Sequence, residues 1–134
     1  SLQEELPCDG YLAMGIFYRL VPDYWIVKVL SGTRGDLDKS LEMQEKGVAC
    51  AGDRVRNLKE LGVTQLCIGT KRKDQALIDA GRASINKYLA LPPKTQTEIV
   101  DMRHGIELLK DPDLACGYSR DGQQELDEAK IPKE

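Results

Sequence analysis

The chain has 134 residues, of which 41% are hydrophobic and 31% charged, with a formal net charge of −3. The length fits one domain of roughly 100–150 residues, and the composition is that of an ordinary globular protein. Disordered, collagen-like and channel-forming classes are therefore excluded, and a nucleic-acid partner is not expected without a strongly basic surface. We predict a single helical domain over residues 1–134.

The first apolar segment, residues 10–30, holds five of the seven aromatic residues and only three charged ones. Those charges, together with Pro22, argue against a membrane span, which needs about 20 mostly uncharged residues. We expect a helix that Pro22 kinks or divides into residues 10–21 and 23–30. The β-branched residues after Trp25 leave a strand as the alternative.

The next segment predicts one long amphipathic helix over residues 37–61. Its apolar positions fall on one face at 3.6 residues per turn, and Asp36 is a suitable N-cap. Gly62 would end this helix. Residues 63–69, which include Cys67, would then form a short apolar connector.

Two further helices are predicted in the second half of the chain. The first begins after Thr70 and ends at the proline pair 92–93. The second begins at a capping box, in which Thr95 and Glu98 satisfy free N–H groups, and ends before Pro112. Its expected core stripe consists of Ile99, Met102, Ile106 and Leu109. Short connections favour an all-α, up-and-down bundle of four or five helices, with residues 111–134 as a loosely packed C-terminal strap.

The composition is unusual in having four widely spaced cysteines, at positions 8, 50, 67 and 116. No Cys-x-x-Cys pair occurs, which excludes zinc-ribbon, thioredoxin-like and haem-attachment motifs. Two disulfides in a secreted or periplasmic protein fit this pattern, and buried free thiols in a cytoplasmic protein are the alternative. The start at Ser1 fits signal-peptide removal and excision from a longer chain equally well.

The disulfide pairing is open among three arrangements. Cys8 precedes the first expected helix and Cys116 follows the last, so an up-and-down bundle would bring them to the same end. Cys50 and Cys67 would meet if the 63–69 connector folded back along the long helix. We therefore expect the pairs Cys8–Cys116 and Cys50–Cys67.

Most of the catalytic sites considered would need the only histidine, His104. The spacing Asp101-x-x-His104 resembles a metal-binding pair of helical bundles, but the predicted core stripe places His104 on the opposite, solvent-facing side. A nucleophilic Ser-His or Cys-His site would need the same exposed residue. We therefore expect no metal, no cofactor and no catalytic residues, although a carboxylate pair among the 22 acids could serve a hydrolase.

The leading functional hypothesis is an exported, non-enzymatic protein that binds another protein as an inhibitor, immunity factor or accessory subunit, or that forms a homodimer. Aromatic residues are typical anchors of such contacts, and the candidates are Tyr18, Tyr24, Trp25 and Tyr118. One alternative is a carrier or sensor with an apolar pocket for a small ligand between the helices. The other is the hydrolase. The basic run 71–73 is expected to be a solvated surface or a docking point for an acidic partner.

Overall fold

The computed structural model describes residues 8–20, 37–51 and 54–118. All the regular secondary structure within these ranges is helical. The predicted all-α class is thereby confirmed. The expected kink at Pro22 and the helical piece 23–30 lie outside the described residues, as do residues 119–134 of the predicted strap. The described elements are α1 (Cys8–Leu20), α3 (Leu37–Ala51), α4 (Val55–Arg72), α5 (Gln75–Leu89), α6 (Gln96–Lys110) and the short 3-10 helix η1 (Pro112–Leu114).

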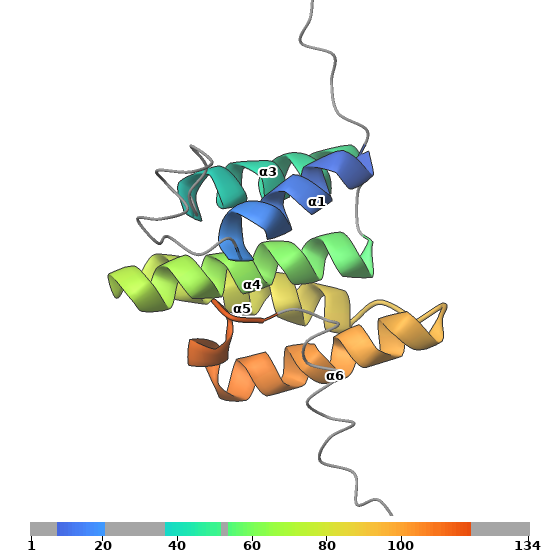
Figure 1. The fold of residues 1–134 in the computed structure, drawn as a ribbon. Coiled ribbons are helices and arrows are strands. Elements are labelled where there is room, and N and C mark those ends of the chain that lie inside the picture. The colour runs from blue at the N-terminus through green and yellow to red at the C-terminus, as the bar shows by residue number, and fades with distance from the viewer. Residues whose placement is uncertain (1–7, 21–36, 52–53, 119–134) are drawn as a thin grey trace, which may run out of the picture.

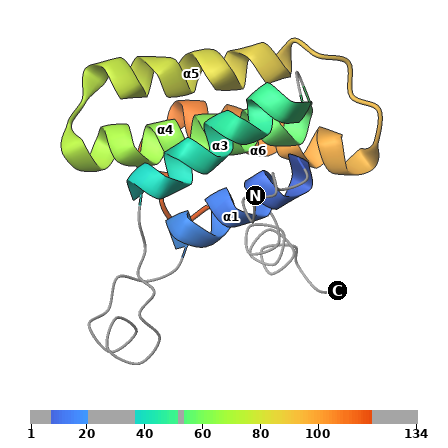
Figure 2. The same ribbon diagram turned by 90° about the horizontal axis from the view of Figure 1, so that it is seen from above.

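The helices form a bundle in which each described helix runs antiparallel to the next (Figure 1). Helices α1 and α3 lie together on one side, and α6 lies on the other. Helices α4 and α5 occupy the middle, and the view from above separates them clearly (Figure 2). No helix in the described ranges is long and apolar enough to cross a membrane.

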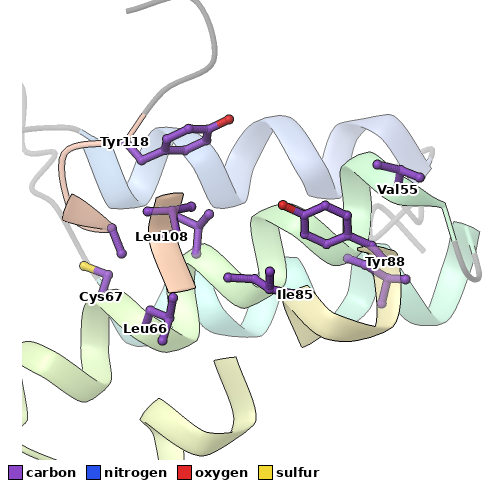
Figure 3. Close-up of a cluster of buried hydrophobic side chains, with 10 residues drawn as sticks. Val55, Leu66, Cys67, Ile85, Tyr88, Leu108 and Tyr118 are labelled. Carbon is purple, nitrogen blue, oxygen red and sulfur yellow. The ribbon is translucent and has the colours of Figure 1, made fainter. Parts of the chain in front are cut away.

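Helix α4 is the centre of the bundle. Of its 18 residues, 12 are buried, because α1, α3, α5, α6 and η1 all pack against it. A helix that packs against neighbours on most of its sides needs no single apolar stripe. The core cluster in Figure 3 contains Val55, Leu58, Val63, Leu66 and Cys67 of α4, with Ile85, Tyr88, Leu108, Ala115 and Tyr118 from later elements.

The predicted connector 63–69 is wrong, because this segment is the second half of α4. Gly62 does not end a helix but faces α5. A Cβ atom there would lie 2.8 Å from Cγ1 of Ile85, and one on Gly81 would lie 2.9 Å from the backbone nitrogen of Leu66. Glycine at these positions allows the two helix backbones to approach closely. The close packing of α4 against α5, and not the end of a helix, therefore accounts for the glycine at position 62.

Helix boundaries can be predicted best where the capping residue lies next to the helix in sequence. The prediction of a single helix over 37–61 is wrong, since α3 ends at Ala51 and α4 begins at Val55. The N-cap of α5 is Asp74, not Thr70, and its carboxylate accepts from Ala76 N and Leu77 N. At α6 the Thr95 hydroxyl accepts from Glu98 N at 3.1 Å, as predicted. The Glu98 carboxylate accepts from Lys94 N at 2.8 Å, one residue earlier than in a standard capping box.

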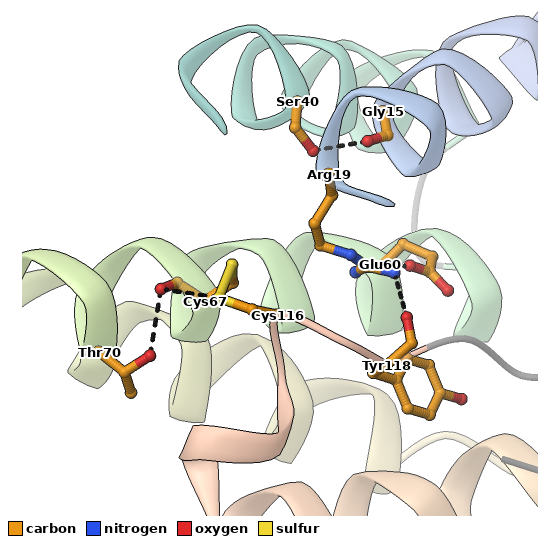
Figure 4. The surroundings of a disulfide bond; sticks show 8 residues. All are labelled: Gly15, Arg19, Ser40, Glu60, Cys67, Thr70, Cys116 and Tyr118. Carbon is orange, nitrogen blue, oxygen red and sulfur yellow. Dashed lines mark hydrogen bonds and ion pairs between the residues drawn. A yellow bond between two sulfur atoms is a disulfide. The ribbon is translucent and has the colours of Figure 1, made fainter. Parts of the chain in front are cut away.

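The two disulfides join Cys8 to Cys50 and Cys67 to Cys116, with Cα–Cα distances of 5.5 and 4.5 Å. The predicted pairing is therefore wrong. Because α1 and α3 are antiparallel, the start of α1 lies beside the end of α3. Cys67 lies within α4 and faces the chain that follows η1 (Figure 4). Two structural disulfides indicate an oxidising compartment.

Candidate functional site

Two places in the described part of the molecule carry charge in an unusual setting. The first is a set of charged and polar side chains in the interior, here called the buried charge cluster. None of its members is more than 6% exposed. It consists of Arg19 of α1, Lys59 and Glu60 of α4, Asp101 and His104 of α6, and Tyr118 after η1.

Lys59 is the central cation of the buried charge cluster. Its Nζ atom lies 2.8 Å from Oδ1 of Asp101 and 3.2 Å from Oε1 of Glu60. It also lies 5.0 Å from the centre of the Tyr118 ring. A buried ammonium is tolerated only with such close counter-charges, and an aromatic face adds to the attraction.

Arg19 connects the end of α1 to the same cluster. Its Nη2 atom donates to the carbonyl oxygen of Tyr118 at 2.8 Å, as Figure 4 shows. Its Nη1 atom lies 3.0 Å from Oε2 of Glu60. That pair is close but poorly aligned for a hydrogen bond, so the attraction is mainly between the two charges. One guanidinium thus binds α4 and the chain after η1.

The prediction that His104 faces solvent is wrong. His104 is 3% exposed, and its Nδ1 atom lies 2.8 Å from the Tyr118 hydroxyl. Of the predicted core stripe, Ile99 and Ile106 are instead exposed. The buried positions of α6 are Asp101, His104, Gly105 and Leu108. These positions have helical spacing. Because two of them are polar, the pattern of apolar residues alone does not identify this buried face.

Tyr88 completes the polar contacts around α6. Its hydroxyl donates to the carbonyl oxygen of Asp101 at 2.9 Å. Burial raises the pKa of this phenol far above its ordinary value, and the negative charges of Asp101 and Glu60 raise it further. The side chain therefore remains a neutral hydrogen-bond donor. Gly105 leaves the room that the Tyr88 ring needs beside α6.

The chemistry available to the buried charge cluster is limited by its position. Its groups could move protons, but they lie beneath the surface and bind one another across α1, α4, α6 and the residues after η1. No group of three or more His, Cys, Asp or Glu side chains within residues 8–20, 37–51 and 54–118 is arranged to hold a metal ion. The geometry favours a structural role for this cluster.

The second place is a solvent-open pocket of about 410 Å³, here called the end pocket. It lies where the start of α4 meets the α5–α6 connection, at the same end of the molecule in Figure 1. Its apolar lining is Val55, Leu91 and Pro92, and its charged lining is Arg54, Arg56, Lys94 and Glu98.

The end pocket is positively charged. Three cations less one carboxylate give a formal charge of +2, although the whole chain carries −3. Among the described residues, no carboxylate lies within ion-pair distance of Arg54, Arg56 or the Lys94 ammonium. Arg54 is also the N-cap of α4, and its side chain makes no capping hydrogen bond. Cationic groups here are therefore available to a ligand.

Tyr18 and Tyr118, the two predicted anchors within the described residues, are not among the residues that line the end pocket. Tyr18 is half-buried, with its ring at 5.6 Å from that of Phe17. Tyr118 is buried in the interior, 5% exposed. Tyr24 and Trp25 lie outside the described residues. Sequence reasoning missed the end pocket, whose only local signal is that two arginines flank Val55.

The comparisons give no relative from which a function could be transferred. No protein-family model, curated protein or solved structure matches this chain.

Proposed function

We propose that this is an exported, non-enzymatic binding protein that acts on another protein as an inhibitor, immunity factor or accessory subunit. The observation that carries the proposal is the difference in solvent exposure between the buried charge cluster and the end pocket. The members of the buried charge cluster are buried and bound to one another, whereas the end pocket exposes three cations that form no ion pair with a carboxylate of the described residues. The two disulfides support export, to a secreted or periplasmic location.

The composition of the end pocket supports a protein as its partner. Arginine is enriched in protein interfaces because its guanidinium combines charge, planar hydrogen bonding and an apolar face. Apolar side chains beside such cations supply the contact that excludes water from the interface. Exposed apolar residues elsewhere on the described surface, such as Phe17 at 42%, could extend the contact.

The test is capture followed by reconstitution. The oxidised protein is immobilised and exposed to extracellular fluid of the source organism, and captured proteins are identified by mass spectrometry. Each candidate is then purified separately and titrated against the protein by calorimetry. We expect one purified candidate to form a complex of fixed stoichiometry. Reduced and alkylated protein is the matched control, and equal binding to that form would contradict the proposal.

A small-ligand carrier is the second candidate, and the size of the end pocket favours it. About 410 Å³ lies within the range of roughly 300–1,000 Å³ that is usual for small-ligand sites. Its described lining has four charged residues beside three apolar ones, whereas the sequence predicts an apolar pocket for such a carrier. Native mass spectrometry of the freshly purified protein tests this candidate, which predicts an added mass that is lost on denaturation. Glu60 and Asp101 meet on Lys59 but are buried, so they offer no support for a hydrolase.

A further inference from the structure

We infer that the end pocket binds the free C-terminal carboxylate of a polypeptide whose last residue is apolar. This inference rests on the proposed function and names the part of the partner that the pocket receives. It is carried by the charge of the pocket, by its apolar lining and by Glu98, the one carboxylate side chain among the described lining residues.

The charge of the end pocket calls for an anion. Arg54 and Arg56 are exposed, and both line the pocket on the α4 side. Lys94 lines it from the α5–α6 connection. Guanidinium groups bind carboxylates through paired N–H donors, and such charge-assisted bonds are about twice as strong as neutral ones. Cations from both walls could therefore contact one carboxylate.

The apolar lining favours a ligand with an apolar group next to its anionic group. Val55, which is 4% exposed, lines the pocket from α4, and Leu91 and Pro92 line it from the α5–α6 connection. An inorganic anion would leave these residues in contact with water. A carboxylate attached to an aliphatic or aromatic side chain would cover them and remove their apolar surface from water, which is favourable.

Glu98 distinguishes a peptide from a fatty acid. Its Oε1 atom accepts the backbone N–H of Lys94 at 2.8 Å, which fixes the carboxylate at the pocket wall. A carboxylate presents up to four acceptor positions, so it can accept further N–H groups. The end of a peptide supplies backbone N–H groups beside its carboxylate, whereas a fatty acid supplies none. The open mouth of the pocket lets the remaining polypeptide continue into solvent.

Short synthetic peptides test the inference without knowledge of the partner. Acetylated glycyl-glycyl-leucine with a free carboxylate is titrated against the oxidised protein, and binding is followed by calorimetry or by NMR shifts. The same peptide as a C-terminal amide, the peptide that ends in serine, and octanoate are titrated in parallel. We expect the leucine acid to bind, and the amide, the serine peptide and octanoate each to bind at least about tenfold more weakly.

Matched variants locate the binding site. Arg54→Gln with Arg56→Gln should weaken binding of the leucine acid by at least about tenfold, because both guanidinium donors are lost. Arg82→Gln with Arg103→Gln removes the same charge from exposed positions outside the pocket and should leave affinity unchanged. Circular dichroism of both variants checks that the fold is retained.

Three results would overturn the inference: equal binding of acid and amide, tighter binding of octanoate than of the peptide acid, or equal losses in the two double variants. The proposed function is judged separately, with the purified partner. A partner that binds wild type and the Arg54→Gln, Arg56→Gln variant equally upholds the function and refutes this site. The absence of any purified partner that binds wild type refutes the function itself.

Discussion

The ammonium of Lys59 lies 2.8 Å from the carboxylate of Asp101, and neither side chain is exposed to solvent. Removing two charges from water costs several kcal/mol for each ion, and only close contact with further polar partners offsets that cost. Here Glu60 supplies a second carboxylate to Lys59. The contact between α4 and α6 is therefore electrostatic at a position where most bundles are apolar.

Replacing Lys59 with methionine should lower the free energy of unfolding by about 3–5 kcal/mol, because the Asp101 carboxylate would remain buried without its cation. Urea denaturation measures the change. Lys110→Met on the exposed side of α6 is the control and should stay within about 0.5 kcal/mol. Adding Asp101→Leu to the Lys59→Met variant should recover part of the loss. A loss below about 1 kcal/mol in the single variant would contradict a stabilising pair.

Tyr88→Phe should change how stability depends on alkaline pH. The pKa of the native phenol is raised above its ordinary value of 10.0, so the unfolded chain ionises first. The contribution of Tyr88 is therefore fully present below about pH 10 and lost as the pH rises further. Near neutral pH the variant should lose about 1 kcal/mol with the bond to the Asp101 carbonyl. Urea unfolding from about pH 8 to pH 11 should show the wild-type advantage shrinking, and a constant difference would argue against the raised pKa.

Peptide mapping without reduction should establish the disulfide pairing directly. Trypsin cleaves after Lys and Arg and places the four cysteines in separate fragments, 1–19, 47–54, 60–71 and 111–120. We expect one linked pair of fragments 1–19 and 47–54 and another of 60–71 and 111–120. Mass spectrometry identifies them, and reduction should release all four. A linked pair of 1–19 and 111–120 would contradict the structure.

Gly81→Ala should destabilise the protein although alanine favours helices. The new Cβ atom would lie 2.9 Å from the backbone nitrogen of Leu66, which cannot move aside as a side chain could. The expected loss is about 1–3 kcal/mol, against a gain of at most about 1 kcal/mol in helix propensity. Gly117→Ala is the control, because nothing lies within 4 Å of its Cβ position. Thermal unfolding followed by circular dichroism compares the two, and equal melting temperatures would show that α4 and α5 can separate without cost.

The helical class and several helix ends could be predicted because their causes are local. Thr95 caps a helix from three residues away, and Pro112 ends one by its own ring. The burial of His104 could not be predicted in this way. His104 packs with Tyr118, 14 residues later, and its helix is also bound to α4 by the Lys59–Asp101 pair, whose members are 42 residues apart in sequence.

The disulfide pairing and the end pocket depended on contacts between distant segments. Gly62 was interpreted as a helix end because a sequence does not reveal that another helix lies against it. Once α4 is continuous through Cys67, the predicted pairing with Cys50 no longer follows. The end pocket combines the start of α4 with the α5–α6 connection, so no single motif could reveal it.

The two disulfides close consecutive rings of the chain. The first ring contains α1 and α3, and the second contains the end of α4 with α5 and α6. The residues between Cys50 and Cys67 belong to neither ring, so one peptide-bond cleavage there would leave two fragments with no covalent link. Packing and non-covalent contacts, such as the hydrogen bond from Arg19 to the carbonyl oxygen of Tyr118, would then be all that holds them together. The first ring can also close before the second half of the chain has been synthesised, which separates two oxidation steps in time.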